Sequence, residues 1–184
     1  MISEYLAKSL LIPKRHPVKK NPQDYGMDYE NIAFKSIDGI NLKGWYIPGT
    51  SGKLIIMTNP MPFSRYGFSA GSQGIFKITG LEVELLLTVR QLNLAGYDVI
   101  IIDFRNHGES DSANEGFCTV GMTEWQDVGG ILNYIASDED LKSKPIGFMS
   151  LCTGANATII AMSKAVELFK NVKCLIAVQP VSAN

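Results

Sequence analysis

Hydrophobic and polar positions change their pattern near residue 53. Before that point, residues 31–37 and 40–47 alternate on either side of Asp38-Gly39, which is the strongest short-range signal for a β-hairpin. After it, apolar positions run together in short blocks, as expected of parallel strands that are buried on both faces. These predicted strands cover residues 54–57, 97–103, 145–149 and 172–178.

Helical periodicity occupies the intervals between the predicted strands. Helices are expected at residues 81–94, 123–136 and 155–169, and a short amphipathic helix at residues 2–12. Strict alternation of short apolar strands with helices indicates parallel pairing and right-handed crossovers. The predicted fold class is therefore α/β: a three-layer α/β/α arrangement with a mostly parallel sheet and an N-terminal antiparallel hairpin.

Two segments fall outside this pattern of strands and helices. Residues 1–23 are expected to form the N-terminal helix and a Pro-rich connector, and residues 24–184 a single domain. The basic run at residues 14–20 is broken by proline, which favours a solvated linker over a membrane or nucleic-acid patch. Residues 59–80 form a long loop. Three of its side chains belong either to a pocket wall or to a mobile, solvated segment: Arg65, Tyr66 and Phe68.

Composition narrows the class of protein. The net charge is −1, so the chain shows no electrostatic footprint for nucleic acid. No apolar run reaches the length of about 18 residues that spans a bilayer, and Glu4 stands where a signal peptide would carry a positive charge. Three cysteines favour a reducing cytoplasm, and none of their spacings matches a zinc site. We therefore expect a cytoplasmic protein without metal or other cofactor, and without a nucleic-acid or membrane partner.

Cys152 is the strongest candidate for chemistry. It lies in Ser150-Leu151-Cys152-Thr153-Gly154, between a predicted strand and a predicted helix. A strand that turns at once into a helix holds its corner residue at a strained, positive φ and exposes the side chain over the helix N-terminus. That terminus favours an anionic side chain, and the N–H of Thr153 is a candidate oxyanion donor. The alternative is a buried core cysteine, since free cysteine is among the most buried residue types.

Small residues on either side of Cys152 favour it over the neighbouring serine. At such a corner, the residues two before and two after the nucleophile are expected to crowd each other, so both have to be small. Around Cys152 those residues are Ser150 and Gly154, and both fit. Around Ser150 they would be Phe148 and Cys152, and Phe148 does not fit.

Three sequence motifs lie at the ends of predicted strands or in the predicted hairpin. They are residues 24–30 with 38–48, residues 103–110 (Asp-Phe-Arg-Asn-His-Gly-Glu-Ser), and Ser150-x-Cys152-x-Gly154. These resemble the N-terminal hairpin, the Asp-x-Arg-Gly-His-Gly-x-Ser turn and the Gly-x-Ser-x-Gly elbow of the α/β-hydrolases, with Asn106 in place of a glycine. The closest branch is that of cytoplasmic esterase-like and dienelactone-hydrolase-like proteins. The resemblance covers nearly the whole chain from about Asp24.

The resemblance implies roles for further residues. The family's second oxyanion donor follows the first buried strand, usually at a His-Gly pair. This chain has Asn59-Pro60-Met61 there, and Met61, which keeps its own N–H, takes the donor position. The histidine that matches His107 lies in a structural turn of the family, so neither His107 nor His16 is expected as the base. Asp103 is expected to cap the turn at Arg105-Asn106.

The family's remaining catalytic groups are an acid and then a histidine, both on strands after the nucleophile. Neither is found in this sequence. We therefore expect the N-terminal part of a longer enzyme whose C-terminal strands are missing here, a chain that a second chain completes, or a free-standing non-catalytic module. Without those further strands, the strand at Cys174–Val178 would be an open edge, which favours self-association or a complementing chain.

The sequence therefore predicts a hydrolase that attacks the carbonyl of a carboxylic ester, thioester or lactone through Cys152. Its partner would be a small acyl substrate, and this chain alone is expected to show little or no turnover. An acyltransferase of the same fold and a non-catalytic binding module are the alternatives.

Overall fold

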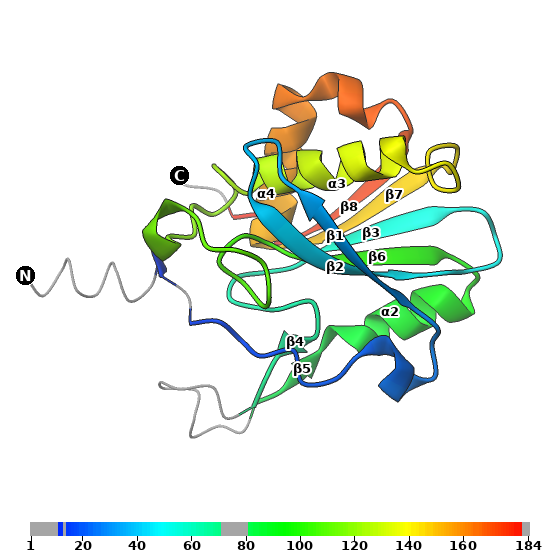
Figure 1. Ribbon diagram of the computed structural model, residues 1–184, viewed down its shortest axis with the longest axis horizontal. Helices are drawn as coiled ribbons and strands as arrows, with labels where there is room; N and C mark the ends of the chain where they lie inside the picture. Colours follow the sequence, from blue (N-terminus) through cyan, green and yellow to red (C-terminus); the bar gives the residue numbers. More distant parts are fainter. Residues whose placement is uncertain (1–10, 13, 71–80, 182–184) are drawn as a thin grey trace, which may run out of the picture.

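The main sheet has six strands and is mostly parallel (Figure 1). The computed structural model describes residues 11–12, 14–70 and 81–181. The strand order is β1-β2-β6-β3-β7-β8, in which β1 and β2 form an antiparallel hairpin, β2 pairs antiparallel with β6, and the other pairs are parallel. The strands are β1 (Glu30–Lys35), β2 (Asn41–Ile47), β3 (Leu54–Thr58), β6 (Asp98–Asp103), β7 (Ile146–Leu151) and β8 (Val172–Val178).

Helices cover both faces of this sheet. In Figure 1, α2 (Leu85–Leu94) lies on one face, and α3 (Trp125–Ser137) and α4 (Thr153–Lys164) lie on the other. Three short 3-10 helices complete the described part: η1 (Pro22–Tyr25), η3 (Asn114–Gly116) and η4 (Val166–Phe169). No helix within that part has the length and apolar character to cross a bilayer. The predicted three-layer α/β/α arrangement with an N-terminal hairpin is confirmed.

Alternate residues of each central strand enter different cores. Ile100 and Ile102 of β6 pack in a core with α3 and α4, whereas Val99 and Ile101 pack in a second core with α2. Successive side chains of a strand point to opposite faces of the sheet. The apolar blocks that form β3, β6 and β7 are therefore buried on both sides of the sheet.

Two segments differ from the sequence prediction. Within the expected loop, β4 (Gly67–Phe68) pairs with β5 (Val83–Glu84), and α2 begins only at Leu85. The close approach requires glycine, because a Cβ at Gly67 would lie 1.9 Å from the Val83 carbonyl oxygen. The last predicted helix ends at Lys164, and η4 follows. This break lets Phe169 stack on Phe148 of β7, with ring centroids 5.8 Å apart. The helix expected at residues 2–12 lies almost wholly outside the described residues.

Arg105 joins the hairpin to α3 in the interior. Its side chain is fully buried, with Nε 2.9 Å from Oδ1 of Asp127, and its guanidinium also donates to both carboxylate oxygens of Asp38 at 2.7 and 2.8 Å. A buried charge needs partners of this kind, because removal of one partner leaves an uncompensated charge. The turn after β6 is thereby fixed against two separate elements.

β8 lies at one edge of the sheet that the described residues form. Five of its seven residues are exposed, and Ile176 is 58% exposed. An exposed apolar edge offers unpaired backbone groups to other strands. We propose that this edge pairs with a strand of a second copy or of a complementing chain.

The edge proposal predicts concentration-dependent self-association. Ile176→Lys places a charge on the edge and should shift the sedimentation coefficient toward that of the monomer. Leu94→Lys is the matched control, since Leu94 is 65% exposed and lies on α2 rather than on the edge strand. A wild-type chain that stays monomeric at all concentrations, or equal effects of both substitutions, would contradict the proposal.

Candidate active site

Cys152 occupies the corner between β7 and α4. Its backbone lies at φ 47° and ψ −112°, outside the regions that ordinary residues prefer. Its N–H donates to the Val178 carbonyl at 2.8 Å, and its own carbonyl accepts from Asn156 N–H at 3.1 Å. The strained strand-to-helix turn expected from the sequence is present, and the side chain is half-buried rather than enclosed in the core.

The close packing that holds this corner involves β3. A Cβ added to Gly154 would lie 2.6 Å from Oγ1 of Thr58 and 2.7 Å from its carbonyl oxygen. Thr58 is the last residue of β3 and pairs with Ser150 of β7. The expected crowding between Ser150 and Gly154 stays a prediction, and Thr58 is a further close neighbour of Gly154. Glycine is needed there because the first turn of α4 rests on the end of β3.

The Ser150 side chain packs in the interior against α4. Its side chain is fully buried, and its Oγ lies 2.9 Å from Oγ1 of Thr158 on α4. This agrees with the choice of Cys152 as the corner residue.

The loop after β3 carries the second oxyanion candidate. Met61 is half-buried, in a turn closed by the N–H of Phe63 donating to the Pro60 carbonyl at 2.9 Å. Asn59, which stands where the family has histidine, donates from Nδ2 to the Ile102 carbonyl at 2.9 Å. The loop therefore starts from a fixed point on β6. The donor roles of Thr153 and Met61 remain predictions.

Arg65 fixes the middle of the same loop. It is buried, its guanidinium forms ion pairs with Asp103 and Glu109, and it lies 4.5 Å from the ring centroid of Trp45. The Asp103 carboxylate also accepts the Glu109 N–H at 2.9 Å. The expected cap of Asp103 on Arg105-Asn106 is wrong, because its carboxylate is used by Arg65 and Glu109. Tyr66 and Phe68 are buried too, so the described part of this loop is packed rather than solvated.

The basic run of the N-terminal segment contacts two distant loops through Arg15 and His16. We call residues 15–19 the strap. Arg15 donates to the Gly108 carbonyl at 2.9 Å and to the Ser110 carbonyl. His16 is buried against Phe68, with ring centroids 4.2 Å apart, and its Nδ1 accepts the Ser69 N–H at 3.2 Å. Arg15, Lys19 and Lys20 are exposed, as expected of a solvated linker, whereas the burial of His16 differs from that expectation.

The solved structures that are similar to this chain include esterases and α/β hydrolases. The esterase Pf2001 of Pyrococcus furiosus matches with a TM-score of 0.71 and 25% identity, over 92% of this chain and 57% of that chain. The α/β hydrolase GrgF of a Penicillium species matches with a TM-score of 0.62 and 20% identity, over 84% and 46% of the two chains. The chain has the α/β-hydrolase fold.

These matches have limits of length and identity. XC6422 of Xanthomonas campestris, described as an α/β serine hydrolase without a lid, matches with a TM-score of 0.57 and 15% identity, over 83% of this chain and 62% of that one. The present chain thus spans less than two thirds of each of these three α/β-hydrolase-fold proteins. No family model and no curated protein matches its sequence.

Neither histidine of the chain is bonded to Cys152. His107 is buried, with Nδ1 2.8 Å from the Arg105 carbonyl oxygen, and burial lowers its pKa. His16, in the strap, accepts the Ser69 N–H and packs against Phe68. Across residues 11–12, 14–70 and 81–181, no group of three or more His, Cys, Asp or Glu side chains is arranged to hold a metal ion. Among the described residues, the elbow of this α/β-hydrolase fold therefore has no histidine bonded to its thiol.

Residues 118–124, before α3, lie against the first turns of α4, and no functional role was predicted for them from the sequence. Glu124 is buried and accepts hydrogen bonds from Thr119 N–H at 2.9 Å and Gly121 N–H at 2.8 Å. Gly121 packs so closely that a Cβ there would lie 2.8 Å from the Ala157 nitrogen. Burial raises the pKa of Cys118, in this segment, to about 12, so its thiol stays protonated. The available signal in the sequence was Glu124, at the start of the helix predicted over residues 123–136.

The burial of His16 in the strap predicts that the free energy of unfolding falls at acidic pH. Burial, with a smaller effect of Lys19, lowers the pKa of His16 below 6.5. Since the folded state prefers neutral His16, its contribution is present above pH 6.5 and is lost as the pH falls below it. Between pH 7.5 and pH 5.5, the urea midpoint should fall less in His16→Gln than in the wild type. His107 is present in both proteins, so it does not contribute to the difference between them. Equal losses in the wild type and the variant would show that His16 does not titrate in this way.

Two buried threonines at the elbow predict opposite effects on stability. Thr58 Oγ1 is buried and has no hydrogen-bond partner among the residues described, whereas Thr158 Oγ1 donates to the Gly154 carbonyl at 2.9 Å. Thr58→Val should raise the free energy of unfolding by about 1 kcal/mol, and Thr158→Val should lower it by a similar amount. Urea denaturation measures both. Destabilisation by Thr58→Val would mean that its hydroxyl has a partner.

Proposed function

We propose that the protein is a hydrolase that acts on a carboxylic ester, thioester or lactone, with Cys152 as the nucleophile. The observation that carries the proposal is the backbone of Cys152, at φ 47° and ψ −112° on a strand-to-helix corner. Strained conformations of this kind persist where surrounding packing enforces them and are concentrated at functional sites. The packing of Gly154 on Thr58 is that enforcement.

The proposed chemistry follows from the position of the thiol. The Cys152 thiolate attacks the substrate carbonyl and forms a carbon–sulfur bond, while the carbonyl electron pair moves to oxygen. The N–H groups of Thr153 and Met61 are proposed to stabilise that oxyanion. Collapse of the tetrahedral intermediate expels the alcohol, thiol or lactone oxygen and leaves an acyl thioester on Cys152. Water then releases the acid and restores the thiol.

The second half of this cycle needs a general base. His107 and His16 are held by other contacts, so we propose that the base lies outside the described residues, together with the acid that orients it. Acylation by an activated ester requires only the thiolate and a good leaving group. For this chain we therefore expect acylation followed by slow deacylation. The free state of Cys118, Cys152 and Cys174 supports placing the protein in the reducing cytoplasm.

The proposal predicts a single-turnover burst of nitrophenolate from 4-nitrophenyl acetate. Its amplitude should approach one equivalent, with a steady rate far below the burst rate because deacylation lacks a base. Cys152→Ala should abolish the burst. Stopped-flow absorbance measures the burst amplitude and the steady rate, and the intact mass of the protein measures the acyl adduct.

The matched control is Cys174→Ala. Cys174 is the exposed cysteine, on β8, and its removal should leave the burst unchanged. A burst that persists in Cys152→Ala, or that disappears in Cys174→Ala, would overturn the assignment of the nucleophile.

A further inference from the structure

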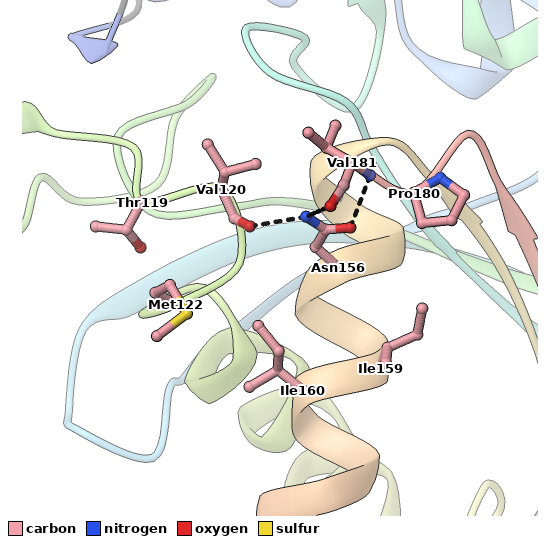
Figure 2. Close-up of a pocket in the computed structure, with 8 residues that line it drawn as sticks. All are labelled: Thr119, Val120, Met122, Asn156, Ile159, Ile160, Pro180 and Val181. Atoms are coloured by element: carbon pink, nitrogen blue, oxygen red, sulfur yellow. Dashed lines mark hydrogen bonds between the residues drawn. The ribbon is translucent and has the colours of Figure 1, made fainter. Parts of the chain in front are cut away.

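One side chain at the start of α4 joins two distant segments to that helix (Figure 2). Asn156 is half-buried. Its Nδ2 donates to the carbonyls of Val120 at 3.2 Å and Val181 at 2.9 Å, and its Oδ1 accepts the Val181 N–H at 3.0 Å. Val120 precedes α3 and Val181 follows β8. Both N–H groups and the oxygen of one amide are therefore used to hold these segments against α4.

Asparagine suits this position through both its chemistry and its length. Val181 gives one hydrogen bond to the side chain and receives one from it, which requires a donor and an acceptor in the same group. An ionised aspartate of the same length could only accept. The room is limited as well, because a Cβ added to Gly121 would lie 2.8 Å from Cβ of Asn156. The three bonds therefore depend on an amide at this distance from the helix.

Three residues with strained backbone lie in the segments that meet at Asn156. Val120 has φ 55°, Cys152 has φ 47° and Gln179 has φ 49°. Positive φ in a β-branched residue such as Val120 is a genuine outlier, and strain of this kind persists where the surrounding structure enforces it. The asparagine side chain bonds to Val120 and holds the chain two residues after Gln179, and its N–H donates to the Cys152 carbonyl. It therefore links all three strained segments.

The corner at Cys152 and the chain after β8 form a closed ring of hydrogen bonds. The Cys152 N–H donates to the Val178 carbonyl at 2.8 Å, and the Asn156 N–H donates to the Cys152 carbonyl at 3.1 Å. The Asn156 side chain then binds Val181, three residues after Val178. Both backbone polar groups of the strained corner therefore belong to this ring. The ring adds a second restraint to the contact between α4 and the end of β3.

We propose that Asn156 is a positioning residue for the nucleophile: its amide holds the peptide between Cys152 and Thr153 in the geometry that acylation requires. The proposal rests on the proposed function, in which the thiol and the Thr153 N–H act on one carbonyl. Because both residues share that peptide, a shift of the corner moves the nucleophile and the oxyanion donor together. Small misplacements of reacting groups are costly in rate. Loss of the Asn156 bonds should therefore slow acylation, while the substrate concentration that half-saturates acylation changes little.

The first test uses Asn156→Asp, which keeps the acceptor and removes both donors. Near pH 7.5 the rate constant for acylation by 4-nitrophenyl acetate should fall at least about fivefold, because the bonds to two carbonyls are lost. Carbonyl oxygens favour the protonated form of a neighbouring carboxyl. Near pH 5 the aspartate should therefore donate again to one of them, and the ratio of the variant rate to the wild-type rate should rise. Asn156→Ala should show the loss without this recovery.

The matched control is Asn171→Asp. Asn171 Nδ2 donates to the Lys142 carbonyl at 2.8 Å, ahead of β8 and at the opposite end of that strand from the corner. The same substitution there should leave acylation unchanged at both pH values. Val181→Pro removes only the Val181 N–H and keeps Asn156 in place, so it should also slow acylation. It tests the ring even where urea denaturation shows that Asn156→Asp does not fold.

A second test separates positioning from ester chemistry. Methyl methanethiosulfonate modifies Cys152 without an acyl group, and mass mapping gives the rate at that cysteine. A rate that falls in Asn156→Asp and recovers near pH 5 would support the proposal. Equal rates in Asn156→Asp, Val181→Pro and the wild type would overturn it, as would a loss without recovery in acid or a loss that Asn171→Asp shares. The predicted pattern with methanethiosulfonate, but no acylation of wild-type Cys152, would instead overturn the proposed function.

Discussion

The contact between the first turn of α4 and the end of β3 is the constraint on which the site depends. Gly154 meets the backbone and hydroxyl of Thr58 with no room for a Cβ. With α4 held this close, the chain has to turn within one residue, and that residue is Cys152, at positive φ. The packing of a helix on a sheet thus produces the strained corner, and the corner presents the thiol at the carboxyl ends of the parallel strands.

Polar contacts from distant segments fix the loops around that corner. Arg65 binds the loop after β3 to Asp103 at the end of β6, and the strap joins that loop to the following turn through His16 and Arg15. Arg65, Asp103 and His16 are buried, so their contacts are costly to break. Such contacts, together with the short pairing of β4 with β5, hold the loop that carries Met61. This is the rigidity that a preorganised oxyanion site requires.

Sequence patterns predicted the parts of this structure that depend on local order. The hairpin around Asp38-Gly39, the buried parallel strands and the corner at Cys152 each follow from periodicity or from a short motif, and the structure has all three. The strap, the use of Asp103 by Arg65, and the packing of Gly154 on Thr58 could not be predicted in this way. Their partners lie on other elements and meet only in the folded chain. Periodicity indicates which face of a helix or strand is buried, but it does not identify the residues that pack against that face.

The central claim is that backbone geometry, rather than exposure, selects the reactive thiol. Cys174 is exposed, Cys152 is half-buried and Cys118 is buried, so a reagent guided by access alone would modify Cys174. The most direct test is treatment with a substoichiometric β-lactone, followed by proteolysis and mass mapping of the three cysteines. The account predicts that the acyl adduct forms on Cys152 well before Cys174. An adduct on Cys174 with Cys152 unmodified would contradict it.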